Sequence, residues 1–190
     1  GNGSGNLRYE YDDADANNMK LYGNYTIDEG YYLFTLQNLI RKEFKIDQGS
    51  SINWSGDLFN AQVDIRALYS VTASLRDLMS ESNLSSNMRT SVPVNCVLML
   101  KDNLMQPTIK FDIDLPSSDE QLKLQVKNLI NTDEMMNRQM MYLLLFGKFY
   151  NPEYVGTTNL VTTGNTGWSF LSTTLSGQLN NWLSQVVTNL

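Results

Sequence analysis

The chain contains no histidine and a single cysteine, Cys96, among its 190 residues. Without histidine, neither a Ser-His-Asp triad nor a Cys-His pair can be built, so hydrolases of those classes are excluded. Structural zinc sites take several Cys or His ligands, which excludes them as well. Because Cys96 lies in the apolar run 94–100, we expect a buried, unreactive thiol. No catalytic residue, metal site or cofactor is therefore predicted.

The chain also lacks a surplus of positive charge. Its 14 Lys and Arg against 20 Asp and Glu give a formal net charge of −6, and no basic cluster exceeds the pair Arg41-Lys42. Nucleic acid is therefore not an expected partner. No segment reaches the roughly 18 apolar residues of a membrane-spanning helix. Hydrophobic residues nevertheless make up 42% of the chain, which is enough for a sizeable core.

Two acidic groups imitate ligand or catalytic sites. Asp13, Asp15 and Asn17 follow the spacing that opens a calcium-binding loop, but the expected glycine and the later bidentate acid are both replaced by asparagine. A solvated acidic turn is the favoured interpretation, and calcium binding is left open. Asp112 and Asp114 alternate with apolar residues, which predicts the solvent face of a strand rather than a catalytic pair.

From residue 19 to about 115, apolar residues recur with a period of two, which predicts strands with one apolar face. Turn residues at 28–30, 47–49 and 55–57 favour short antiparallel links. Residues 74–91 are predicted to be a loop, although 74–79 could instead form one helical turn or an edge segment. The apolar rows are Met19, Leu21, Tyr25 and Ile27; Ala61, Val63, Ile65, Ala67 and Tyr69; Val92, Val94, Cys96, Leu98 and Leu100; and Ile109, Phe111, Ile113 and Leu115.

After Pro116 the period becomes helical. Ser117 or Ser118 is predicted to cap a first helix with Asp119 and Glu120 in its first turn, and Thr132 to cap a second. The methionines of the second helix could form an adaptable binding surface, but the favoured interpretation is that they belong to the hydrophobic core. The apolar sides comprise Leu122, Val126, Leu129 and Ile130 in the first helix, and Met136, Met140, Leu143, Leu144 and Gly147 in the second.

A third amphipathic helix is predicted at the end of the chain, after a Gly/Thr/Asn-rich loop. Its polar face carries no charge, whereas helices that lie on membrane surfaces usually carry Lys or Arg. Docking onto the sheet or onto a partner is therefore preferred to membrane contact. The docking residues of this hypothesis are Trp168, Leu171, Leu175, Leu179, Trp182 and Val186.

Several segments, taken in order, carry a family resemblance. GNYTI at 23–27 leads through FKIDQGSSINWSGD at 44–57 into AQVDIRALY at 61–69. VPV at 92–94, PTIKFDIDLP at 107–116, EMMNRQ at 134–139 and LSGQLNNWLSQ at 175–185 follow. In this order they resemble the C-terminal domain of the TamB-like translocation and assembly module family, over about residues 19–185. The NWLSQ variant resembles the Bacteroidetes-type branch.

The resemblance implies a non-enzymatic role in outer-membrane protein assembly and in moving phospholipid between membranes. It implies a periplasmic domain at the outer membrane, with its longer parent anchored in the inner membrane. The implied partner is an outer-membrane barrel protein of the Omp85 type.

The expected fold is mainly β: a curved, trough-like antiparallel sheet, either a β-taco or a partly open sandwich, with C-terminal amphipathic helices. Residues 1–18 are expected to be a linker, 19–116 the β domain, 117–150 a helical segment, 151–166 a flexible loop and 167–190 an amphipathic helix. An open apolar face would form a groove for acyl chains, and a closed core would leave a structural, partner-docking domain. The predicted groove residues are Leu21, Tyr25, Ile27, Val63, Ile65, Leu98, Leu100, Ile109, Phe111 and Ile113.

Overall fold

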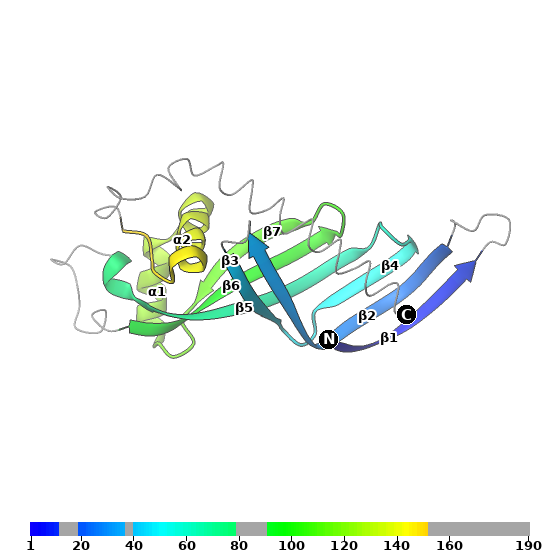
Figure 1. Cartoon of the computed structure of the whole chain (residues 1–190), viewed down its shortest axis with the longest axis horizontal. Coiled ribbons are helices and arrows are strands. Elements are labelled where there is room, and N and C mark those ends of the chain that lie inside the picture. The colour runs from blue at the N-terminus through cyan, green and yellow to red at the C-terminus, as the bar shows by residue number, and fades with distance from the viewer. Residues whose placement is uncertain (12–18, 37–39, 79–90, 152–190) are drawn as a thin grey trace.

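An antiparallel sheet runs along most of the molecule (Figure 1), and the computed structural model describes residues 1–11, 19–36, 40–78 and 91–151. Every strand pairing in these residues is antiparallel, and the described sheet runs from β1 at one edge to β7 at the other without closing into a barrel. The predicted mainly-β fold with helices after the sheet is confirmed. The strands are β1 (Asn2–Tyr11), β2 (Met19–Leu36), β3 (Ile40–Ile46), β4 (Ser51–Asp57), β5 (Gln62–Ser74), β6 (Ser91–Asn103) and β7 (Thr108–Asp114).

The long strand β2 changes partner along its length. Residues 20–26 pair with β4 and residues 30–36 pair with β3, so β3 and β4 are two halves of one returning strand. The predicted turn at 47–49 separates them, and Gly49 adopts a φ of 92° there, which favours glycine. The turn predicted at 28–30 is wrong. Strand β2 continues through these residues with an irregularity in its pairing with β1 between Ile27 and Glu29, and the buried side chains change from Leu21 and Ile27 before it to Tyr32 and Phe34 after it. Backbone hydrogen bonds from Ile27 N to Ser50 O and from Gly49 N to Ile27 O tie this part of β2 to the 47–50 turn.

The turn predicted at 55–57 also lies elsewhere. Those residues belong to β4, which stays paired with β2 as far as the Lys20–Asp57 pair. The chain turns just beyond, where Asn60 N donates to Asp57 O and Phe59 N donates to the Asp57 carboxylate. Asp57 therefore ends the strand by accepting the first hydrogen bonds of the turn.

Strand β1 replaces most of the linker expected at residues 1–18, although residues 12–18 lie outside the described part. It pairs with β2 from Asn2 opposite Glu29 to Tyr11 opposite Met19. The two backbones approach so closely that a Cβ added to Gly23, which has a φ of 125°, would lie 1.9 Å from Asn6 O. Glycine in the neighbouring strand thus gives the backbone of β1, a segment with few apolar side chains, the room to pair.

The loop predicted at 74–91 begins with ordered structure. Strand β5 continues to Ser74, and Leu75–Leu78 forms a single 3₁₀ turn whose Leu75 is buried. Residues 79–90 lie outside the described residues, and β6 begins at Ser91.

Two helices, α1 (Glu120–Leu129) and α2 (Asp133–Phe146), lie at one end of the sheet (Figure 1). The cap of α1 is Asp119 rather than the expected Ser117 or Ser118, since Asp119 Oδ1 accepts from Leu122 N at 2.8 Å. A carboxylate both caps the helix and complements its dipole, which favours Asp119 over a serine. Thr132 caps α2 as predicted, its Oγ1 accepting from Met135 N at 3.1 Å.

The apolar sides of both helices pack into the core as predicted. Leu122 and Val126 of α1 are buried, as are Met140 and Leu144 of α2. Neither α1 nor α2 has the length and apolar character needed to cross a membrane. The loop predicted at 151–166 and the helix predicted at 167–190 fall, from residue 152 onward, outside the described part of the chain.

Candidate functional site

One face of the sheet carries the apolar rows of successive strands side by side. Across the β5–β6 pair, Ile65 lies opposite Leu100, and across β6–β7, Leu98 lies opposite Phe111. Towards the other edge, Val63 lies opposite Ile52 of β4, which in turn lies opposite Tyr25 of β2. Paired residues point to the same side of a sheet, so these strands share one apolar face.

All ten residues predicted to face a groove lie on this face and join one hydrophobic cluster. Tyr25 and Ile109 are partly buried and pack against the cluster, and the other eight are buried within it. Leu21 is fully buried, and the most exposed of the eight, Ile113, retains only 8% of its surface. The ten residues therefore belong to one packed cluster, and a groove for acyl chains along this face stays a prediction.

Sequence reasoning missed the aromatic residues that complete the face. Phe34 and Phe44, from the β2–β3 hairpin, meet edge to face with ring centroids 6.2 Å apart, and Phe44 lies 5.7 Å from Tyr69 of β5. Trp54 of β4 is buried, and its Nε1 donates to Leu58 O at 3.1 Å. The alternation of Tyr32 with Phe34 and of Phe44 with Ile46 is the signal that could have found them.

Helix α2 packs against β3, β6 and β7, and the residues after it reach β5. Gly147, in the left-handed conformation that ends α2, sits close to the Val71 side chain. The buried Gln139 clamps the following turn, because its amide donates to Tyr150 O at 3.2 Å and accepts from Tyr150 N at 2.7 Å. The two hydrogen bonds satisfy both the donor and the acceptor of the Gln139 amide, which is buried among the apolar side chains of α2.

A pocket of about 800 Å³ lies beside this helical cover. Tyr142, Phe146 and Phe149 line one side of it, and the ends of β5 and β6 line the other. Burial raises the pKa of Asp77 in its wall, while the positive charges of Lys148 and Arg76 oppose that rise.

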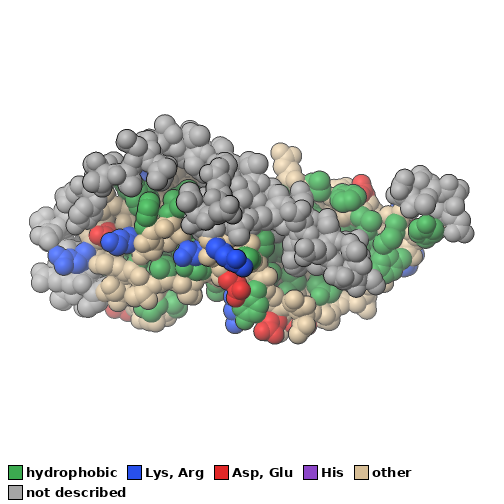
Figure 2. All heavy atoms as spheres, viewed as in Figure 1, with side chains coloured by type: hydrophobic (Ala, Val, Ile, Leu, Met, Phe, Trp, Pro, Cys, Tyr) green, Lys and Arg blue, Asp and Glu red, His purple; other side chains and the backbone are tan. Residues whose placement is uncertain are grey.

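Some of the large exposed apolar side chains lie at the end of the sheet away from the helices, whereas Leu124, Met135 and Phe146 lie on α1 and α2. In the view of Figure 2, hydrophobic side chains reach the surface at that end, whereas Lys and Arg side chains lie towards the helical half. The β4–β5 and β6–β7 turns meet there, since Leu104 N donates to Ala61 O and Asn103 donates to the Asn60 side chain at 2.5 Å. The large exposed apolar residues of this end are Tyr9, Tyr11, Phe59 and Met105.

The other residues singled out in the sequence are the cysteine, the carboxylates of β7, the calcium-like loop and the C-terminal docking residues. Cys96 is fully buried as predicted, and burial raises the pKa of its thiol to about 12. Asp112 and Asp114 lie on the face of β7 opposite to the apolar rows, as predicted. No three Cys, Asp or Glu residues of the described chain are grouped so that they could hold a metal ion. The calcium-like residues Asp13, Asp15 and Asn17 and the docking residues Trp168, Leu171, Leu175, Leu179, Trp182 and Val186 lie outside the described residues.

Comparison with known proteins identifies a family for this chain. The family model described as the TamB C-terminal domain matches residues 1–190. No curated protein and no solved structure matches the chain.

Proposed function

Because this chain belongs to the TamB C-terminal domain family, we propose that its apolar sheet face carries phospholipid acyl chains during outer-membrane assembly. The family is periplasmic, anchored in the inner membrane and non-enzymatic, and it serves outer-membrane protein assembly. Acyl-chain conduction by this chain's own sheet is the step that the proposal adds.

The observation that carries the proposal is the continuity of the apolar face from β2 across β4, β5 and β6 to β7. Backbone N–H and C=O groups inside a sheet are hydrogen-bonded to neighbouring strands. A hydrocarbon chain lying on such a face therefore contacts side chains and not unpaired backbone groups. Apolar side chains exclude water along the whole path, which is the environment that an acyl chain needs in an aqueous compartment.

The helical cover is the part of the structure that has to yield to a lipid. Met140 and Met141 of α2 are both buried against the face. Methionine fills irregular spaces and re-packs at low cost, so a cover made of methionine and leucine can accept a chain in place of its own contacts. In this proposal α2 lies over the face at rest and gives up contacts when lipid arrives.

The proposed partner is an outer-membrane barrel protein of the Omp85 type, and the proposed location is the periplasmic side of the outer membrane. Membership of the family supports both. We expect the Bacteroidetes-type variant of the family, on the NWLSQ segment at 181–185 of the C-terminal region.

Lipid binding tests the proposal directly. The protein purified from cells is expected to carry phospholipid that mass spectrometry of an organic extract detects, and to bind a fluorescent fatty acid. Ile109→Gln, on the apolar face, is expected to weaken fatty-acid binding at least several-fold, because a polar, partly buried amide replaces a contact with hydrocarbon. Leu33→Gln is the matched control, since Leu33 is 41% exposed on a strand of the same sheet.

A second function, a closed partner-docking domain, is favoured by the burial of eight of the ten face residues. Such a domain would carry no lipid and bind no fatty acid. Absence of both, in a protein that still binds an outer-membrane barrel partner, would replace the first function by the second.

A further inference from the structure

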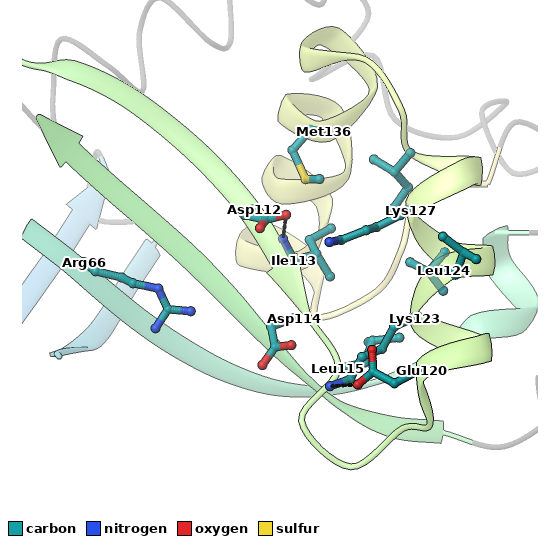
Figure 3. A pocket seen from close by; sticks show the side chains of 12 residues that line it. Arg66, Asp112, Ile113, Asp114, Leu115, Glu120, Lys123, Leu124, Lys127 and Met136 are labelled. Atoms are coloured by element: carbon teal, nitrogen blue, oxygen red, sulfur yellow. Dashed lines mark hydrogen bonds and ion pairs between the residues drawn. The ribbon is translucent and has the colours of Figure 1, made fainter.

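A pocket of about 350 Å³ with charges of both signs opens between α1 and β7 (Figure 3). Strands β5 and β7, helix α1 and the first turn of α2 contribute to its walls. Its charged lining consists of three cations, Arg66, Lys123 and Lys127, and three carboxylates, Asp112, Asp114 and Glu120.

Some of these charges already have partners. Arg66 forms an ion pair with Asp47, and Lys123 lies 3.5 Å from Glu120 on the same helix. Asp112 Oδ1 accepts a hydrogen bond from Ile113 N, which leaves its second oxygen open. Within the described chain, the side chains of Asp114 and Lys127 enter no ion pair or hydrogen bond.

The free groups come from opposite walls. Figure 3 shows Lys127 extending from α1 towards β7, beside Ile113 and Asp112, while Asp114 lies further along the strand. An ammonium and two carboxylates therefore face one hollow without neutralising each other. A ligand that carries both an anion and a cation, a few bonds apart, can pair with both at once.

The base of the pocket is apolar and belongs to the main core. Ile113 and Leu115 at the end of β7 and Val126 and Ile130 of α1 all line it, and each is buried in the same cluster as the apolar face. The outer part of the pocket therefore carries charges of both signs, and its base is formed by side chains of the cluster that we propose to contact hydrocarbon.

We propose that this pocket binds the headgroup of a zwitterionic phospholipid with a primary ammonium, of the phosphoethanolamine type. The phosphate pairs with Lys127, the ammonium donates to Asp112 and Asp114, and the glycerol end points to the apolar base. The inference rests on the proposed lipid function and adds its headgroup class. A trimethylated ammonium has no N–H to donate, and an uncharged glycerol headgroup leaves both carboxylates without a cation.

Short-chain lipids below their micelle concentration test the headgroup. Titration calorimetry on the full chain is expected to rank dihexanoyl phosphatidylethanolamine above phosphatidylcholine, and phosphatidylcholine above phosphatidylglycerol. We expect about tenfold between the first and the last, which corresponds to about 1.4 kcal/mol. Glycerophosphoethanolamine, which has the headgroup without acyl chains, is expected to bind more weakly than the lipid. Equal or tighter binding of glycerophosphoethanolamine would indicate a small-molecule site and would overturn the lipid assignment.

Matched substitutions separate a headgroup site from a structural role. Asp114→Asn is expected to remove the preference for phosphatidylethanolamine while leaving phosphatidylglycerol binding equal or tighter. Lys127→Gln is expected to weaken both lipids alike, because both carry the phosphate. Asp64→Asn is the control, since Asp64 is an exposed carboxylate of β5 outside the pocket. Circular dichroism checks that all three variants are folded.

The outcomes distinguish this inference from the proposed function. If lipids bind but Asp114→Asn leaves the ratio of the two affinities unchanged, the headgroup site is overturned and acyl-chain binding stands. If none of the lipids binds, both are overturned.

Discussion

At the scale of single residues, burial sets the chemistry of Cys96. Its thiol is fully buried in the middle of β6, and burial raises its pKa from 9.0 to about 12. As pH rises, the unfolded chain ionises this thiol first, which favours unfolding. The stabilisation is complete below pH 9 and is lost progressively as the pH approaches 12.

The prediction concerns the difference between the natural chain and Cys96→Ala. That difference in free energy of unfolding is expected to decrease by about 1.4 kcal/mol per pH unit above pH 9. Urea titrations of both proteins at pH 8, 9, 10 and 11 measure it, and the subtraction removes the contribution of the tyrosines. A difference that stays constant over this range would show that the thiol reaches water in the folded state.

The first turn of α1 gives a second test at this scale. Asp119→Ala is expected to cost about 1 kcal/mol of stability, because Leu122 N loses its acceptor and the helix N-terminus loses a carboxylate. Ser118→Ala, one residue earlier, is expected to change stability by less than about 0.5 kcal/mol. Urea unfolding of the two variants compares them, and a larger loss at Ser118 would move the cap to the serine that the sequence favoured.

At the scale of elements, β1 depends on the glycine of its neighbour. In Gly23→Ala the new Cβ meets Asn6 O at 1.9 Å, so β1 is expected to detach from β2. Hydrogen exchange of the amides of residues 2–11 measures this, and they are expected to exchange at nearly the rate of an unstructured peptide. The other strands are expected to keep their protection.

Gly49→Ala is the matched control for that experiment. Gly49 also has a positive φ, 92°, but nothing lies within 4 Å of a Cβ placed there. It is expected to lose only the conformational preference of glycine, about 1 kcal/mol, with β1 still protected. If the amides of residues 2–11 exchanged at similar rates in both variants, the space that Gly23 leaves for the backbone of β1 would not be what allows β1 to pair with β2.

Some of these strands could be predicted from the sequence and others could not. Rows such as Val63, Ile65 and Ala67 were predictable because one face of a strand has to be apolar while the other meets water. Strand β1 was not, because it carries few apolar side chains and its pairing depends on the room that Gly23 of the neighbouring strand leaves for its backbone. The passage of β2 through residues 28–30 was hidden for a similar reason. Asp28, Glu29 and Gly30 have the composition of a turn, but hydrogen bonds join the adjacent Ile27 to a distant turn at 47–50 and the strand continues past an irregularity in its pairing.

At the scale of the whole molecule, the sheet combines a continuous apolar face with two helices, α1 and α2, that lie at one end of it. All ten face residues could be predicted from periodicity, because strand pairing preserves the side to which each row points. The mixed-charge pocket could not be predicted. It needs Arg66 of β5, Asp114 of β7 and Lys127 of α1 in one place, and only the folded chain brings those distant residues together.

Contact between acyl chains and the apolar face is the central claim, and Trp54 is a reporter built into that face. Its ring is 2% exposed, on β4 opposite Gly23 of β2. In a W168F/W182F variant it is the single tryptophan of the chain, so its fluorescence reports this position alone.

The decisive measurement is quenching of Trp54 in that variant by phospholipid brominated along its acyl chains, with the same lipid unbrominated as the control. Our account predicts saturable quenching by the brominated lipid and none by the control. It also predicts that Ile109→Gln reduces the quenching and Leu33→Gln does not. Unchanged Trp54 fluorescence at lipid concentrations that saturate binding would contradict the account and leave the face as a closed core.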